Sequence, residues 1–257
     1  MAKKETVTQT LIVAFVLCIV CAVIVSAAAV VLKPKQDANK ELERKINVLA
    51  AAGLMKEGAD VELLFSSFTA KVVDLDSGNY LADIDVSSIN SRKEAKDPAL
   101  STQLSKKDDL AKIGRRVNRA IVYILEEEGK IKTIVLPIHG YGLWSTLYGF
   151  LALEGDINTV AGLAFYSHTE TPGLGGEIDN PRWKAQWPGK KLYNEKGELV
   201  LQVTKGKNNP KLASSIHKID GLSGASLTTR GVDNLVHFWL DEGGFGPFLT
   251  QLKQVGK

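Results

Sequence analysis

An apolar, uncharged run near the N-terminus constrains this 257-residue chain more than any other feature. No charged residue occurs from Thr6 to Leu32, and between Leu11 and Leu32 the only polar side chain is Ser26. As a helix rising about 1.5 Å per residue, the 22 residues from Leu11 would span roughly 33 Å, enough for a hydrocarbon core about 30 Å thick. The run predicts a single transmembrane anchor.

A cleaved signal peptide is the alternative interpretation of this run. The segment 26–29 imitates the small-residue site at which signal peptides are cut, but the apolar run continues to Leu32, which favours a retained anchor. Lysines flank both ends of the run, so their count does not decide the orientation of the anchor. These lysines are Lys3 and Lys4 before the run and Lys33, Lys35 and Lys40 after it.

Both cysteines of the chain, Cys18 and Cys21, lie inside the apolar run. A C-x-x-C pair is typical of redox or metal sites, but two thiols are only half of a four-coordinate site. Small apolar side chains on one face of a lipid-embedded helix explain them better. Without further cysteines, the rest of the chain has no disulfide bonds.

The charge composition excludes one class of partner. The chain has 32 Lys and Arg against 29 Asp and Glu, a net charge of +3. Binding to nucleic acid requires a concentrated basic surface, so no nucleic-acid partner is expected. Hydrophobic residues make up 44% of the chain and charged residues 24%, which is typical of a folded globular protein.

After the anchor, hydrophobic periodicity predicts an α+β fold with a largely antiparallel sheet and flanking helices. Lys33-Pro34-Lys35 is expected to end the apolar helix, with a separate polar helix running to Gly53. Strands are expected at 69–74, 80–85, 119–125, 130–138, 147–153, 159–167 and 199–204, and helices after Asp60 and at about 226–240 and 247–255. The predicted domains are the anchor at 1–33, a linker helix with an α/β part at 34–116, and a main domain at 117–257.

Several familiar motifs fail on detail. The glycine-rich segment 139–145 lacks the third glycine of a dinucleotide fingerprint, since Ser145 occupies that position and a strand follows. Ser215 and Lys218 match S-x-x-K, but the companion motifs of penicillin-binding enzymes are absent. The four histidines have no metal-ligand spacing and are expected on the surface or in loops. We therefore predict no metal site.

The segment 220–229 is the most informative part of the chain. Small residues and hydroxyls lead directly into a predicted helix, whose first N–H groups and dipole favour an anion. Ser226 or Thr228 could bind a phosphate or be bonded to one, and an ordinary Ser/Thr helix cap is the simpler alternative. Periodicity does not distinguish phosphate binding from phosphate attachment.

These residues resemble a known signature. The segment Asp220-Gly221-Leu222-Ser223-Gly224-Ala225-Ser226 is similar to D-x-x-S/T-G-A-T/S, the flavinylation motif of the FMN-binding domain family. In that family a phosphoester joins FMN to the hydroxyl of the last position, here Ser226. The family most often has Thr there, and the neighbouring hydroxyls Ser223, Thr228 and Thr229 remain alternative acceptors.

The resemblance extends over essentially the whole chain to one family, the C-subunits of the sodium-translocating NADH:quinone oxidoreductase. It includes the N-terminal anchor and the segments 139–144, 170–175, 183–187 and 244–249. The resemblance implies covalently bound FMN on Ser226 and no catalytic acid or base from this chain. The residues expected to contact FMN are Ser223, Gly224, Ala225, Leu227, Thr228, Gly142, Leu143, Trp144, Glu170, Thr171, Gly173, Leu174 and Gly175.

The resemblance also implies a role. A flavoprotein of this family sits in the bacterial inner membrane with its domain in the periplasm, alongside subunits A, B, D, E and F. Its FMN takes electrons from a membrane iron–sulfur centre and passes them to the FMN of the B-subunit, toward ubiquinone, while the complex exports sodium. A flavin transferase attaches the FMN. The alternatives are the flavinylated G-subunit of an Rnf-type complex and a membrane-tethered binding domain without a redox role.

Overall fold

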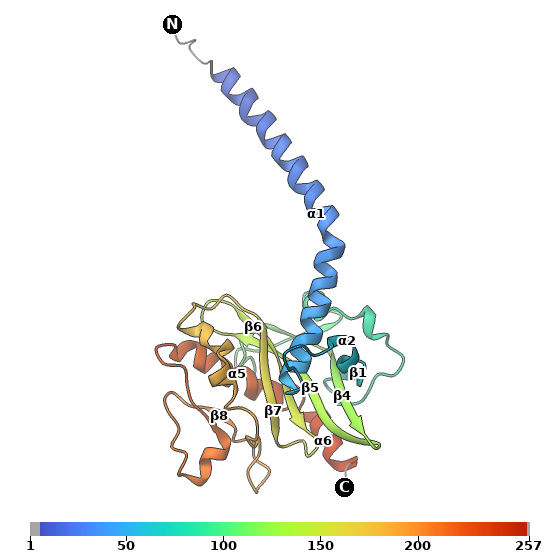
Figure 1. The fold of residues 1–257 in the computed structure, drawn as a ribbon, viewed down its shortest axis with the longest axis vertical. Coiled ribbons are helices and arrows are strands. Elements are labelled where there is room, and N and C mark those ends of the chain that lie inside the picture. Colours follow the sequence, from blue (N-terminus) through green and yellow to red (C-terminus); the bar gives the residue numbers. More distant parts are fainter. Residues whose placement is uncertain (1–5, 256–257) are drawn as a thin grey trace. The chain divides into compact units, whose positions relative to one another are not determined.

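The computed structural model describes residues 6–255 of the chain (Figure 1). The chain divides into two compact units, Met1–Glu43 and Arg44–Lys257. Lys3 and Lys4, which flank the predicted anchor, lie outside the described residues.

The first unit consists of the larger part of helix α1 (Val7–Ala51). The most apolar stretch of α1 has a mean hydropathy of 3.1, and its apolar side chains are exposed, so its length and composition suit a membrane span. The prediction that the helix ends at Lys33 is wrong, because α1 continues through Pro34. Proline removes one backbone hydrogen bond, but the helix-favouring Lys, Glu, Ala and Leu residues that follow continue the helix.

The second unit is built on a five-stranded antiparallel sheet with the order β1-β4-β5-β6-β7. Glu128 and Gly129 join β4 to β5, and both have positive φ angles, as the tight turn of this hairpin requires. The strands are β1 (Phe68–Asp74), β4 (Arg119–Glu127), β5 (Lys130–Tyr141), β6 (Thr146–Glu154) and β7 (Val160–Ser167).

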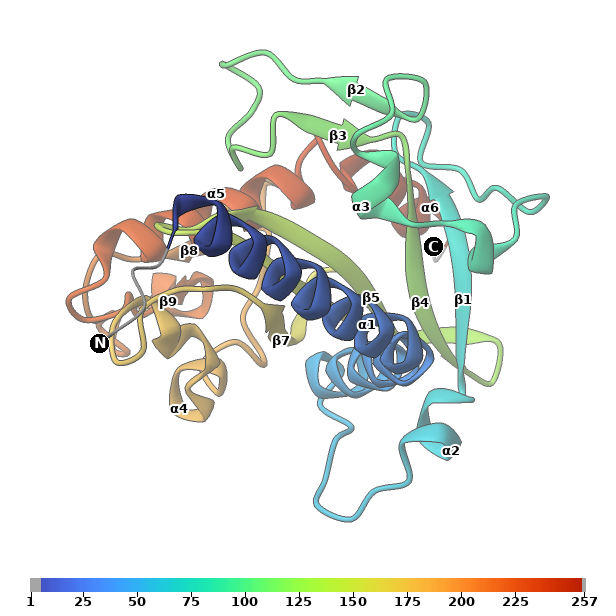
Figure 2. The same ribbon diagram turned by 90° about the horizontal axis from the view of Figure 1, so that it is seen from above.

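Both faces of the sheet are covered. Helix α5 (Ser226–Leu240) runs alongside β5 (Figure 2), and with α6 (Gly246–Val255) it forms the larger core cluster. On the other face, Val48 and Leu49 at the end of α1 pack with α2 (Val61–Phe65) against the sheet. Successive side chains of a strand point to opposite faces of the sheet, so the consecutive buried residues of the central strands contribute to both cores. The predicted α+β fold, a long apolar N-terminal helix followed by a domain with a largely antiparallel sheet, is confirmed.

Short elements fill the connections. Strand β2 (Ser101–Gln103) pairs with β3 (Arg115–Val117), and β8 (Gln202–Val203) pairs in parallel with β9 (Lys218–Ile219). The short helices are η1 (Val86–Ser88), α3 (Ser91–Glu94), η2 (Gly175–Asp179), α4 (Pro181–Lys184) and η3 (Ala213–His217).

Two predicted strands are wrong in extent. In the segment 80–85 only Tyr80 forms a bridge, with Val73, and the Asp85 carboxylate instead caps η1. The strand expected at 199–204 is reduced to β8, because its partner β9 has only two residues. The predicted domain boundary at 116/117 stays a prediction, although β1 and β4 pair across it within one sheet.

Candidate functional site

Glu170 lies at the centre of the site and joins two segments distant in sequence. Its Oε1 atom accepts hydrogen bonds from the backbone N–H groups of Leu143, Trp144 and Ser145, at 3.1, 2.9 and 3.3 Å. Its Oε2 atom accepts one from the Thr228 hydroxyl at 2.7 Å. Since Glu170 is only 5% exposed and Thr228 is fully buried, the carboxylate clamps the β5–β6 loop to the first turn of α5.

The hydrogen bonds also set the charge of Glu170. Burial alone raises the pKa of a carboxyl group, because it disfavours the ionised form. The bonds from the Thr228 hydroxyl and the three N–H groups outweigh burial, and the pKa of Glu170 lies below its usual value of 4.5. At neutral pH Glu170 is therefore ionised, and it accepts these four hydrogen bonds as an anion.

Two glycines leave the space that this carboxylate occupies. A Cβ atom on Gly142 would lie 2.7 Å from Glu170 Oε1, and one on Gly175 would lie 2.5 Å from Thr228 Oγ1 and 2.6 Å from Glu170 Oε2. Any side chain at these positions would displace the clamp. The Glu170 carboxylate therefore requires glycine at both positions, because no side chain fits beside it.

The first turn of α5 separates the candidate acceptor hydroxyls. Gly224, with a φ of +73°, turns the chain into the helix, and Ser226 is the first helical residue. The Thr228 hydroxyl is bound to Glu170, and the buried Thr229 hydroxyl accepts the N–H of Leu222 at 3.0 Å. Ser226 is exposed, and within the described residues its hydroxyl makes no hydrogen bond to the core. Ser223 is the other exposed hydroxyl of the segment.

Hydrogen bonds at Asp220 hold the loop before α5. The Trp183 indole N–H donates to the Asp220 carbonyl at 2.8 Å, and the Asp220 N–H donates to Gln186 Oε1 at 3.0 Å. The Asp220 carboxylate accepts the N–H of Asn208 at 2.7 Å. The segment 183–187 therefore supports the loop.

Apolar side chains are exposed around Ser226. Leu227 is 51% exposed, Trp144 is 65% exposed and Leu174 is 44% exposed. Leu174 comes close to the turn before α5, because a Cβ atom on Gly224 would lie 3.1 Å from its Cδ2 atom. Large exposed apolar side chains beside a glycine-rich turn are typical of a surface that covers a flat ligand.

The structure brings most of the predicted contact residues together. Glu170 links the loop that contains Gly142, Leu143 and Trp144 to Thr228, and Gly175 packs on the same clamp. Thr171, Gly173 and Ser223 are exposed. For all of the predicted residues, contact with FMN stays a prediction.

Sequence reasoning missed two cations. A hollow of about 170 Å³ lies beside α5 and includes Leu143, Leu227, Lys112 and Arg230 in its lining. Arg230 follows Ser226 by one helical turn, so its position on the same face of α5 was readable from the spacing. Lys112 arrives from a distant loop, which no local pattern indicates.

The expectation of surface or loop histidines is wrong for His139. This residue lies within β5, and its ring packs between Tyr148 and Trp239. Among the residues that the structure describes, no group of three or more His, Cys, Asp or Glu side chains could hold a metal ion.

Known proteins resemble this chain in sequence and in fold. The model of the FMN-binding domain family matches residues 142–241. The C-subunit of the Na(+)-translocating NADH-quinone reductase is 53% identical in Pseudomonas aeruginosa, over 99% of both chains, and 45% identical in Haemophilus ducreyi, over 98% of both chains. The crystal structure of NqrC from Shewanella oneidensis superimposes with a TM-score of 0.75 at 37% identity, covering 84% of this chain and 97% of the other.

Proposed function

Because the chain belongs to the C-subunit family of the Na(+)-translocating NADH-quinone reductase, we propose that it carries FMN esterified to Ser226 and relays electrons within that complex. The relatives and the FMN-binding domain confirm the predicted resemblance, and the domain supports FMN as the cofactor. The chain is thus a flavoprotein subunit of an oxidoreductase complex. The names of its relatives favour this family over the Rnf alternative.

The exposure of the Ser226 hydroxyl is the observation that best supports covalent attachment of FMN at this residue. Thr228 and Thr229 are 0% and 2% exposed, and both hydroxyls take part in internal hydrogen bonds. A bulky phosphoester on either of them would break the clamp or the turn before α5. Ser226 carries its hydroxyl at the surface of the same turn, which supports it as the acceptor.

The residues present suit FMN. A phosphate on Ser226 would lie at the N-terminus of α5, where free N–H groups and the helix dipole favour an anion. Arg230, one turn further along α5, can add a positive charge. The exposed side chains of Trp144, Leu174 and Leu227 offer apolar surface for a flat ring system.

Attachment needs a flavin transferase with FAD as the donor. The Ser226 Oγ atom attacks the phosphorus of the FMN half of FAD, the bond between the two phosphates breaks, AMP leaves, and the hydroxyl proton is released. Serine is less hindered than the threonine usual in the family, and it lacks the β-methyl group that restricts the side-chain rotamer.

Bound FMN supplies the redox chemistry, and the chain holds it in place. Glu170 fixes the two segments that contain the proposed contact residues, and α1 tethers the domain to the membrane. We propose that the domain lies in the periplasm, next to the other subunits A, B, D, E and F. There it takes electrons from a membrane iron–sulfur centre and passes them to the FMN of the B-subunit, toward ubiquinone.

Covalent attachment is tested by measuring whether flavin stays with the protein after denaturation. Protein produced with a flavin transferase is precipitated with acid, and flavin absorbance is compared between the wild type, Ser226→Ala and the control Ser223→Ala. Wild type and Ser223→Ala should stay yellow, while Ser226→Ala and wild type made without the transferase should be colourless. Yellow Ser226→Ala precipitate would reject the site, and a colourless wild type made with the transferase would favour a tethered binding domain.

A further inference from the structure

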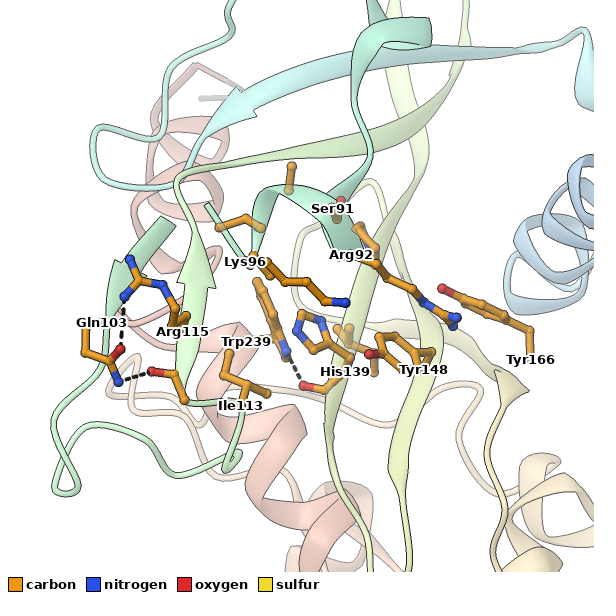
Figure 3. A pocket seen from close by; sticks show the side chains of 16 residues that line it. Ser91, Arg92, Lys96, Gln103, Ile113, Arg115, His139, Tyr148, Tyr166 and Trp239 are labelled. Atoms are coloured by element: carbon orange, nitrogen blue, oxygen red, sulfur yellow. Dashed lines mark hydrogen bonds between the residues drawn. The ribbon is translucent and has the colours of Figure 1, made fainter. Parts of the chain in front are cut away.

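A second cavity of about 540 Å³ opens between α3, β3, β5 and the end of α5 (Figure 3). None of the residues that line it belongs to the segments 142–145, 170–175 or 223–229, so it is separate from the proposed flavin site. Its volume lies in the range of pockets that bind small molecules, about 300–1,000 Å³.

One wall of this cavity is aromatic. The His139 ring stacks on Tyr148, with 5.4 Å between ring centroids and 17° between planes, and lies 4.9 Å from Trp239. The Trp239 indole N–H donates to the His139 carbonyl at 2.6 Å, which fixes both rings. Tyr166 lines the same wall (Figure 3). This rigid wall offers ring faces and edges to a flat molecule.

The charged groups of the lining all have the same sign. Arg92, Lys96 and Arg115 line the cavity, and among the described residues no carboxylate does so. Arg115 is held by bonds to Ser101 and to Gln103 Oε1, the latter at 2.9 Å. Three cations without a carboxylate make the cavity electropositive.

Arg92 both contacts the aromatic wall and contributes positive charge to the cavity. Its guanidinium carbon lies 3.9 Å from the centroid of the Tyr148 ring, so the planar group lies against the aromatic wall. The side chain is exposed and donates a hydrogen bond to the Tyr166 hydroxyl, and the remaining N–H donors of the guanidinium can bind an oxyanion. Lys96 reaches the cavity from the same segment of chain, close to Arg92 (Figure 3).

The low pKa of His139 is consistent with an electropositive cavity. Burial, and then the charge of Arg92, lower the pKa of His139 to about 4. The imidazole is therefore neutral at neutral pH, and it adds ring surface to the cavity without adding charge. An anion bound near Arg92 would oppose that charge and raise the pKa of His139.

We propose that this cavity binds a small flat aromatic anion, with its ring against His139 and Tyr148 and its carboxylate or phosphate at Arg92 and Lys96. The aromatic wall selects the flat body, and the guanidinium fork selects the oxyanion by paired hydrogen bonds. A neutral molecule of the same shape leaves these cations without a counter-charge.

The probe for this proposal is 2-naphthoate, with neutral 2-naphthamide as its matched control. The full-length flavinylated protein in lipid nanodiscs, labelled with ¹³C and ¹⁵N at histidine, is titrated with each compound while the His139 ring resonances are followed by NMR. We expect saturable shifts with naphthoate, a His139 pKa raised by about one unit, and binding of naphthamide weaker by about tenfold.

Variants locate the anion. Arg92→Gln should weaken naphthoate binding by about tenfold, Arg92→Lys should retain part of it, and Arg182→Gln, an exposed cation away from the cavity, should leave it unchanged. Equal binding of naphthoate and naphthamide, or equal binding by wild type and Arg92→Gln, would overturn the proposal. Unmoved His139 resonances at millimolar naphthoate would overturn it as well.

Discussion

The Glu170 carboxylate and the Thr228 hydroxyl lie 2.7 Å apart, and this contact fastens helix α5 to the loop after β5. The other oxygen of the same carboxylate accepts three successive backbone N–H groups, those of residues 143–145. One buried side chain therefore sets the relative position of the two segments on which the proposed flavin site depends.

Removal of the Glu170 carboxylate should loosen both segments. Glu170→Ala leaves three N–H groups and the Thr228 hydroxyl without their acceptor, and it should destabilise the protein by about 3 kcal/mol. Glu170→Gln retains an acceptor oxygen and should cost about 1 kcal/mol. Thermal unfolding, together with the ratio of flavin to protein absorbance, measures both effects. Glu195→Ala, on an exposed turn, is the control, and an Ala variant at position 170 with wild-type stability would contradict the clamp.

Gly175 should be the most sensitive glycine of the site. In Gly175→Ala the new methyl group would lie 2.5 Å from Thr228 Oγ1, so the hydrogen bond to Glu170 must break or shift. We expect a loss of about 1–3 kcal/mol and less flavin incorporated. Gly206→Ala is the matched control, because nothing lies within 4 Å of a Cβ atom there. Equal stability of the two variants in urea unfolding would contradict the close packing at Gly175.

Stability should fall in mild acid because of His139. Its pKa is about 4 in the folded protein and about 6.5 in the unfolded chain, so between these values the unfolded chain binds the extra proton. The stabilisation is complete above pH 6.5 and is lost as the pH falls toward 4, by up to about 3 kcal/mol. His139→Phe keeps a flat ring and should reduce the slope of unfolding free energy against pH in this window. An unchanged slope would contradict the buried, neutral imidazole.

The orientation of the domain is testable with one engineered thiol. Both native cysteines lie in the apolar part of α1, so a single exposed Lys211→Cys provides a separate target for a membrane-impermeant maleimide. A periplasmic domain predicts labelling in intact spheroplasts and protection in inside-out vesicles. The protein without this substitution reports any labelling of Cys18 and Cys21, and the reverse pattern would place the domain in the cytoplasm.

Local patterns predicted the elements that consist of long apolar runs or that begin with a clear helix signal. The strands of the β4–β5 and β6–β7 hairpins are largely continuous apolar runs separated by turn residues, and α5 begins at Ser226 as its small-residue opening indicates. The segment 80–85 is also partly apolar and follows a turn, but its pairing with β1 is limited to the bridge of Tyr80 with Val73 and the bond from the Leu81 N–H to the Val72 carbonyl. Periodicity reports the exposure of side chains, and it does not show whether a partner strand is present.

The site was predictable only in part for the same reason. The flavinylation motif names Ser226, and resemblance named Glu170, but nothing in the spacing of Glu170 and Thr228, 58 residues apart, indicates that they touch. The electropositive cavity is less visible still, because Arg92, His139 and Trp239 come from three distant segments. Long-range contacts of this kind depend on the register of the sheet, which a single sequence does not give.

The central claim is the phosphoester on Ser226, and a peptide mass map of the protein from its native membrane tests it most directly. We predict that the peptide containing Ser226 carries the added mass of FMN less one water, and that fragmentation places this mass on Ser226. Flavin on Thr228 or Thr229 would contradict the site derived from the buried hydroxyls, and the absence of flavin from every peptide would contradict the covalent electron relay itself.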